Sequence, residues 1–268
     1  MTAETRSDQV RELLADFTLT ESAPGTFEVT PPDWYGPRLF GGHTVAYATA
    51  AAARVDGGHR GPHSAHCYFL RPVRPSVPLT MTVEVVRRSR SFRTNEVRMA
   101  QDGACVFTMT AQFHEDETAE EWQPPSPVGE GPSGEPDPWD WGPFELLVLP
   151  NPVAAVDATE QVTRRHWVRL TGPLPDDAAT AAAVAAYVSD MTASGARPLS
   201  LGRWDGYLDA SLDHALWFHR PIRLDEWALF EVRCAVNHAG RSLIRGSLYD
   251  ADGRLCLSMA QEMLIREI

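Results

Sequence analysis

One pattern occurs in both halves of this 268-residue chain and constrains its fold more than any other feature. The run HCYFLRPVR at 66–74 aligns with ALWFHRPIR at 215–223, an offset of 149 residues. The matched pairs are Phe69/Phe218, Arg71/Arg220, Pro72/Pro221 and Arg74/Arg223. At the same offset Ala111-Gln112 falls on Ala260-Gln261, and Asp102-Gly103 falls on Asp252-Gly253 after a one-residue shift. The same order of landmarks in both halves predicts two copies of one structural unit.

Each copy combines an alanine-rich run with strand-like runs. The alanine-rich runs lie at 38–55 and 179–191. Alanine is the strongest helix former, and a helix of such small side chains lets a sheet approach closely, so both helices are predicted to be buried. Strand-like runs separated by turn signals fill residues 64–114 and recur in the second half. A helix followed by antiparallel strands indicates an α+β unit.

The segment between the copies differs in composition. Residues 116–157 are rich in Pro, Gly, Asp and Glu, which cannot bury enough apolar surface to fold alone, and predict a linker. The predicted domains are therefore 1–115 and 158–268.

The charge excludes one class of function. The net charge is −12, with 24 Lys and Arg against 36 Asp and Glu, which argues against a nucleic-acid binder. The one basic run, RRSRSFR at 87–93, is interpreted as a solvated strand and turn; contact with an anionic ligand is the alternative.

Cysteine usage and hydropathy point to the cytoplasm. The four cysteines form no C-x-x-C pair and lie in apolar segments, as expected of free thiols in a reducing compartment. No apolar run approaches the ~20 residues that span a bilayer, and we expect no signal peptide. His59, His63 and His66 lack the spacing of a metal site, so neither a metal nor a cofactor is predicted.

Several runs resemble the acyl-CoA thioesterase II family. RLFGGHTVAYATAAA is similar to the family's helix start, and SLDHALWFHRPIRLDEWALF is similar to its second-domain signature. RSLIRGSLYDADGRLCLSMAQEMLIR resembles its C-terminal hairpin. The resemblance implies a double hotdog, in which two long antiparallel sheets wrap around the alanine-rich helices and fuse into one continuous sheet. It also implies hydrolysis of acyl thioesters.

The resemblance also implies site residues. The family's Asp before the His-x-x-Trp-Phe-His run is here Asp213, and its Gln in the last strand is Gln261. A family hydroxyl on an intervening strand aligns near Ala235, where Asn237 is the nearest polar substitute.

Thioester hydrolysis needs a positioned water and donors for the developing oxyanion. Asp213 is expected to act as base and Gln261 to position the water. A helix start at Gly42 and His43 offers free amides and a positive dipole end to the substrate carbonyl, and His214 is a further candidate on the substrate side. Ser64 stands at the position of Asp213 in the first copy, which favours one active site per chain.

Two alternatives to hydrolysis stay open. A hotdog dehydratase or related enzyme on a carrier-bound acyl chain would use His43 with Asp213 or Asp190. A non-catalytic acyl-binding or scaffold protein is the other. The expected partner is an acyl thioester of CoA or a carrier, with no nucleic acid or membrane, and open sheet edges favour a homo-oligomer.

Overall fold

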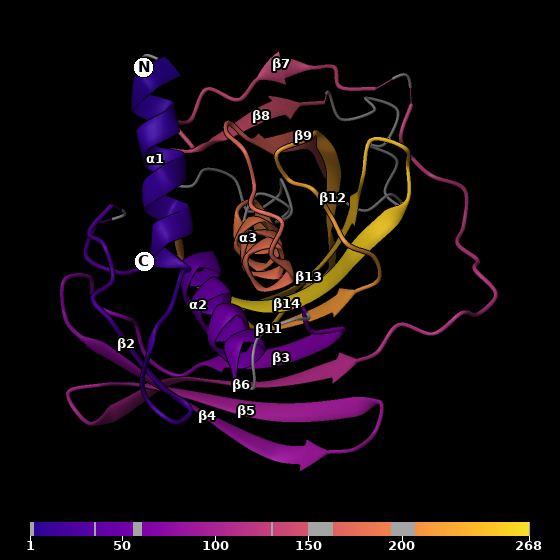
Figure 1. The fold of residues 1–268 in the computed structure, drawn as a ribbon. Helices are drawn as coiled ribbons and strands as arrows, with labels where there is room; N and C mark the ends of the chain where they lie inside the picture. Colours follow the sequence, from indigo (N-terminus) through magenta and orange to yellow (C-terminus); the bar gives the residue numbers. More distant parts are fainter. Residues whose placement is uncertain are drawn as a thin grey trace.

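A computed structural model describes residues 3–34, 36–55, 61–129, 131–149, 163–193 and 207–267. Within these residues the chain folds into long antiparallel strands curved around two central helices (Figure 1).

The elements of the first half follow the predicted order. They are α1 Ala3–Asp16, β1 Glu21–Ala23, β2 Thr26–Val29, α2 Gly41–Arg54, β3 Ser64–Phe69, β4 Leu79–Arg88, β5 Phe92–Gln101 and β6 Ala104–His114. The remaining elements are β7 Glu135–Pro136, β8 Phe144–Val148, β9 Thr163–Leu170, α3 Ala178–Asp190, β10 Tyr207–Ser211, β11 Asp213–Phe218, β12 Ala228–His238, β13 Arg241–Tyr249 and β14 Leu255–Glu267.

The order of strands in the sheet displays the duplication. It runs β1-β2-β4-β5-β6-β3-β11-β14-β13-β12-β9-β8-β7, with β10 paired to β14. Read outward from the centre, β3-β6-β5-β4-β2 in one half corresponds to β11-β14-β13-β12-β9 in the other. The halves meet where β3 and β11 pair antiparallel, with Ala65 opposite Leu216. The expected continuous sheet around two helices is therefore present.

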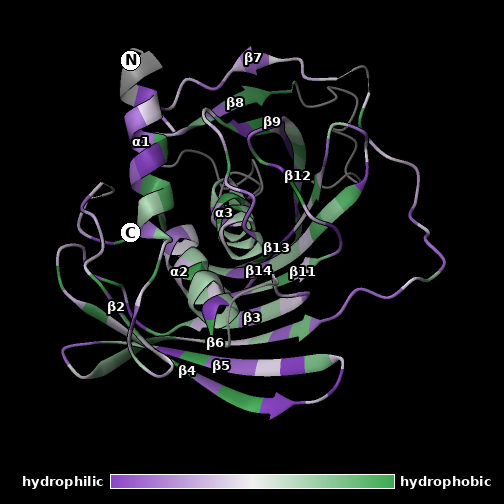
Figure 2. Cartoon of the chain, in the orientation of Figure 1, coloured by the Kyte–Doolittle hydropathy of each residue, from purple (hydrophilic) through white to green (hydrophobic). Residues whose placement is uncertain are grey.

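Small side chains allow the two central helices to pack together inside the sheet. Ala183 and Ala185 of α3, and Ala46 and Ala50 of α2, are fully buried. The pale green helices of Figure 2 lie on the inner side of strands whose hydropathy alternates. The alternation follows from the strand period of two, which turns every second side chain toward the helices.

The N-terminal helix is attached to this core by polar contacts. Asp16, the last residue of α1, contacts the Nε2 of His43, and the Tyr47 hydroxyl donates to the same carboxylate at 2.5 Å. Burial and this carboxylate both raise the pKa of Tyr47, so the phenol stays protonated and donating.

Part of the predicted linker belongs to the sheet. Residues 144–148 form β8, which pairs with β9, with Phe144 opposite Leu170. The composition of 116–157 gave no sign of this strand because it is short and lies between Pro- and Gly-rich stretches. The domain boundaries themselves stay a prediction.

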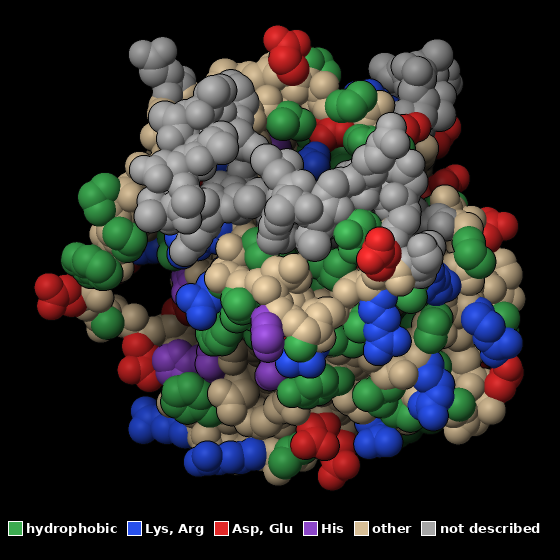
Figure 3. All heavy atoms as spheres, turned by 180° about the vertical axis from the view of Figure 1, so that it is seen from behind, with side chains coloured by type: hydrophobic (Ala, Val, Ile, Leu, Met, Phe, Trp, Pro, Cys, Tyr) green, Lys and Arg blue, Asp and Glu red, His purple; other side chains and the backbone are tan. Residues whose placement is uncertain are grey.

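Charged side chains of both signs are exposed on the face opposite to that of Figure 1. There, among the atoms coloured by type, basic and acidic side chains are interspersed along the lower edge (Figure 3). Arg87, Arg88 and Arg90 are exposed at the β4–β5 hairpin. Across the described ranges, no helix combines the length and apolar character needed to cross a bilayer.

Close helix packing makes a testable prediction. Ala183→Leu adds three carbons at a fully buried position on α3, and overpacking of this kind costs about 1–3 kcal/mol of unfolding free energy. Ala15→Leu is the matched control, because Ala15 is an exposed position of α1; it should shift the free energy by less than about 0.5 kcal/mol. Urea denaturation of both variants checks this, and equal stabilities would contradict the packing described.

Candidate active site

The ends of the two central helices approach each other at one point. Asp190, the last residue of α3, is 7% exposed and accepts a hydrogen bond from the backbone amide of Gly42 in the first turn of α2. The approach requires glycine: a Cβ on Gly41 would lie 2.6 Å from Asp190 Oδ2, and one on Gly42 would lie 2.5 Å from the carbonyl oxygen of Tyr187. The Gly-Gly pair thus allows the start of α2 to contact a carboxylate.

Burial makes the carboxyl of Asp190 a weaker acid than an ordinary aspartate. Desolvation raises the pKa of its carboxyl to about 7, although hydrogen bonds from Gln261, the Gly42 amide and Ser211 act in the opposite direction. The carboxyl is therefore partly ionised near neutral pH, as a general base working in that range requires.

Gln261 connects the polar groups of this cluster. It is fully buried on β14, and its Nε2 donates to Ser211 Oγ at 2.7 Å as well as bonding Asp190. Its Oε1 lies 2.5 Å from Nδ1 of His214. Because the amide oxygen needs a donor there, His214 carries its proton on Nδ1.

The neutral form of His214 completes this chain of hydrogen bonds. Burial lowers the pKa of His214 to about 4, so the ring is uncharged at neutral pH. Its Nε2 lies 2.8 Å from Ser189 Oγ, whose hydroxyl is also 2.7 Å from the carbonyl oxygen of Ala186. The orientation of the Gln261 amide is thereby set, with its nitrogen toward Ser211 and Asp190.

A β-bulge aligns Ser211 and His214 on one face. Ser211 lies opposite Met263, whereas Ala215 lies opposite Ala260. Residues 212–214 of one strand therefore face only 261–262 of the other, which is one extra residue. Without it, residues three apart would point to opposite faces of the sheet.

An apolar pocket opens onto the cluster. Its volume is about 390 Å3, and Asp190 and Ser211 both line it. Its apolar walls are formed by Leu39, Phe40, Phe69, Leu70, Val73, Val106, Met191 and Met263. Gln261 does not reach the pocket and lies behind the two lining groups. The arrangement presents a base and a hydroxyl to a ligand with an apolar part.

Asp213 lies elsewhere. Its Oδ1 accepts from the backbone amide of Glu262 at 2.7 Å, and its Oδ2 lies 3.2 Å from Nε2 of the half-exposed His66. These contacts place its carboxylate on the solvent side of the sheet, while Gln261 is on the helix side. The expectation that Asp213 and Gln261 share a water is not met, because strand alternation separates them.

Some of the remaining predicted residues lie in the cluster, and others lie outside it. Gly42 is in the cluster through its amide, and His214 is in it as the partner of Gln261. His43 is fully buried against Asp16 and does not line the pocket, so the dehydratase pairing of His43 with Asp213 or Asp190 is absent.

Asn237 is also away from the pocket. It is exposed near the β12–β13 turn and accepts from Ser242 at 2.8 Å. Strands β13 and β14 separate β12 from β11, so neither Ala235 nor Asn237 reaches the cluster.

The first copy lacks the equivalent groups. In the first copy, Ala65 and Ala111 pair at the positions that His214 and Gln261 occupy in the second copy. This match aligns the last strands of the two copies with the one-residue shift. Gln112, which the constant offset equates with Gln261, is exposed and donates to Thr94. Gln261 is therefore not simply a residue that the fold requires in both copies.

The helix ends are asymmetric too. At the other end of the helix pair, the last residue of α2, Arg54, donates to Asp177 and Thr180 at the start of α3, at 3.4 and 3.2 Å. A cation thus stands where the counterpart site has a carboxylate.

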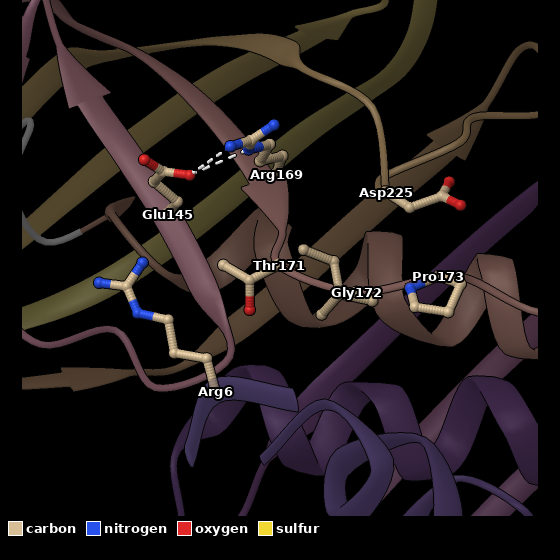
Figure 4. A pocket seen from close by; sticks show the side chains of 8 residues that line it. Arg6, Glu145, Arg169, Thr171, Gly172, Pro173 and Asp225 are labelled. Carbon is tan, nitrogen blue, oxygen red and sulfur yellow. Dashed lines mark hydrogen bonds and ion pairs between the residues drawn. The ribbon is translucent and has the colours of Figure 1, made fainter. Parts of the chain in front are cut away.

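Other cavities lack comparable chemistry. One, about 630 Å3, is lined by Arg6 and by charged groups that are already paired: Arg169 binds Glu145 at 2.7 Å (Figure 4), and Asp225 binds Arg223. A third, about 270 Å3, lies at the start of α3 beside His63 and His219. No described residues form a group of three or more His, Cys, Asp or Glu suited to a metal ion, and His59 lies outside those residues. All four cysteines are free.

Sequence reasoning missed Ser211, and it considered Asp190 only as a dehydratase partner of His43. Ser211 precedes Asp213 by two residues, and regular alternation gave no reason to place it beside Gln261. Asp190 had a signal that was available: it is the only charged residue in α3, at the end of an otherwise apolar helix.

Comparison with known proteins identifies the family of this chain. The acyl-CoA thioesterase N-terminal domain model matches residues 30–114, and the C-terminal domain model matches 124–265. The chain is 31% identical to acyl-coenzyme A thioesterase 8 of Mus musculus, with 85% of this chain and 80% of that protein covered.

Solved structures extend the comparison. The acyl-CoA thioesterase II TesB2 of Mycobacterium marinum superposes with a TM-score of 0.82 at 28% identity, covering 97% of both chains. A protein of Alicyclobacillus acidocaldarius described as a hot dog fold superposes at 0.72 with 21% identity, which concerns the fold alone.

The molecule is thus a double hotdog protein, as the repeated landmarks predicted. The chain belongs to the acyl-CoA thioesterase family.

The buried carboxyl makes a prediction about stability. Because folding raises the pKa of Asp190 from 3.8 to about 7, the native state holds more protons than the unfolded state between these values, and stability falls as pH rises through them. Asp190→Asn removes this loss. Relative to wild type it should gain about 2–4 kcal/mol between pH 4 and pH 8.

Urea denaturation at several pH values measures this gain. Asp33→Asn, at an exposed position, is the matched control and should show no comparable pH-dependent gain. A constant difference between Asp190→Asn and wild type across this pH range would contradict the raised pKa.

Proposed function

We propose that this protein hydrolyses the thioester bond of acyl-CoA, with Asp190 as the general base and Ser211 as a second ligand of the attacking water. The observation that carries the proposal is the position of these two groups. Both line an apolar pocket, and both are bonded to the buried amide of Gln261. Membership in the acyl-CoA thioesterase family supports the same chemistry.

A single water molecule is the nucleophile in the proposed reaction. Asp190 removes a proton while the water oxygen attacks the carbonyl carbon, and the carbonyl becomes an oxyanion. Collapse of this intermediate breaks the C–S bond, and the thiolate leaves with the proton that Asp190 gained. The positive end of the α2 dipole borders the same pocket at Gly41 and favours the negative charge that develops.

Gln261 and His214 act as positioning residues in this scheme. Gln261 does not line the pocket; it holds Ser211 and Asp190 in place from behind. His214 fixes the orientation of the amide. The water ligand expected from Gln261 is instead assigned to Ser211, whose hydroxyl also replaces the one sought near Ala235.

The pocket suits the two parts of the substrate. Its apolar walls accept an acyl chain. Arg38 and Arg71 also line it and are exposed, so they offer positive charge to an anionic carrier such as the phosphates of CoA. A carrier-protein thioester presents a phosphate as well and is the alternative within this proposal.

We also propose that the protein acts in the cytoplasm. Four free thiols suit action in the reducing cytoplasm. Self-association is expected through sheet edges, which end in the short strands β1 and β7 among the described residues.

Substitution of the base tests the proposal. Asp190→Asn should lower kcat/KM for release of free thiol from acyl-CoA by about 10²–10⁴, the usual contribution of a general base. Ser211→Ala, which removes the hydroxyl proposed to bind the water, should lower it by about tenfold. Asp33→Asn is the control for loss of a distant carboxylate. Wild-type rates in Asp190→Asn would refute the assignment.

The pH profile gives an independent check. The pKa of Asp190 is raised to about 7, and only its ionised form accepts a proton. Thus kcat/KM should rise with pH and level off above about pH 7 to 8. A profile that is already flat at pH 5 would contradict the assignment of Asp190 as the base.

A further inference from the structure

Asp213 occupies the irregular part of the strand that carries Ser211. We propose that Asp213 is a positioning residue, which stabilises the β-bulge at 212–214 and thereby turns Ser211 toward the pocket. The inference rests on the proposed function, since it assigns a role to Asp213 in the same site.

The bulge disturbs the pairing of one strand position. Three residues face 261–262, so the ladder cannot be regular at Glu262. The Leu212 amide donates to the carbonyl oxygen of Glu262 at 2.9 Å, and the amide of Glu262 donates to the Asp213 carboxylate at 2.7 Å. A side chain therefore accepts where a regular ladder would supply a backbone carbonyl.

The bulge is what the site needs. Ser211 and His214 both bond to the side chain of Gln261, so both must face the helices. Residues three apart in an unbroken strand face opposite sides. A regular strand could present only one of the two groups to Gln261.

The first copy differs from the second at the position of this carboxylate. There Ser64 stands at the position of Asp213. β3 and β6 keep one register from Ser64 opposite Gln112 to Phe69 opposite Phe107, and just before it the His63 amide donates to the carbonyl oxygen of Gln112, as the Leu212 amide does to that of Glu262. The first copy thus shares this backbone contact but has no carboxylate beside it and no cluster.

A second contact joins the bulge to the other copy. Asp213 Oδ2 lies 3.2 Å from Nε2 of His66 on β3, across the junction of the two halves. His66 is half-exposed and touches no residue of the cluster, which makes it a control for this contact.

The proposed role needs an acceptor atom and no proton transfer. Asparagine keeps an oxygen that accepts from Glu262, whereas alanine leaves the amide without a side-chain acceptor. We therefore compare Asp213→Asn, Asp213→Ala, His66→Ala and Asp190→Asn in thiol release from acyl-CoA. Hydrogen exchange of the Glu262 amide, followed by NMR, serves as a readout independent of activity.

The expected results separate a positioning residue from a base. Asp213→Asn should keep at least about a third of the wild-type kcat/KM with an unchanged pH profile, because the side-chain oxygen of asparagine still accepts from the Glu262 amide. Asp213→Ala should lose about tenfold or more and exchange the Glu262 amide faster. His66→Ala should stay within about threefold of wild type.

Other outcomes overturn the inference. Loss of activity in Asp213→Asn as deep as in Asp190→Asn would make Asp213 a base, and wild-type behaviour of Asp213→Ala would remove its role. If Asp213→Ala does not fold, the Asp213→Asn result decides alone. Full activity in Asp190→Asn would instead refute the proposed function. The exchange rate of the Glu262 amide would still test whether Asp213 stabilises the bulge.

Discussion

The contact between the carboxylate of Asp190 and the first turn of α2 is the constraint on which the rest of the molecule depends. A carboxylate can be buried there only because an amide, a hydroxyl and a side-chain amide donate to it. Those donors come from α2, β10 and β14, so the two copies of the repeat must be packed together before the site exists. Alanine and glycine at the helix interface make that distance possible.

The two copies have kept one architecture and diverged in chemistry. Strand order and helix placement are shared, yet the positions of His214 and Gln261 are alanines in the first copy. Arg54 with Asp177 closes the helix end that corresponds to Asp190 with Gly42. The expectation of one active site per chain is consistent with this difference, although it was first drawn from Ser64 and Asp213.

The fold was predictable from the sequence, and the site was predictable only in part. Repeated landmarks and alanine-rich helices determine the fold because periodicity and side-chain size act locally. The cluster depends on a register shift of one residue, which no local pattern encodes. Asp213 was therefore chosen over Asp190, and a hydroxyl was sought on β12 when Ser211 lies beside Gln261. Gly42 was found because a Gly-Gly pair begins an alanine-rich run, and Gln261 was found because the C-terminal run resembles that of the family.

The junction of β3 with β11 holds both copies in a single chain. In a symmetric pair of identical subunits, every substitution appears twice, so a helix end could not carry arginine in one subunit and aspartate in the other. Covalent fusion removes that restriction. One half can then lose its catalytic groups and keep only a structural role, while the other half acquires the residues of the site independently.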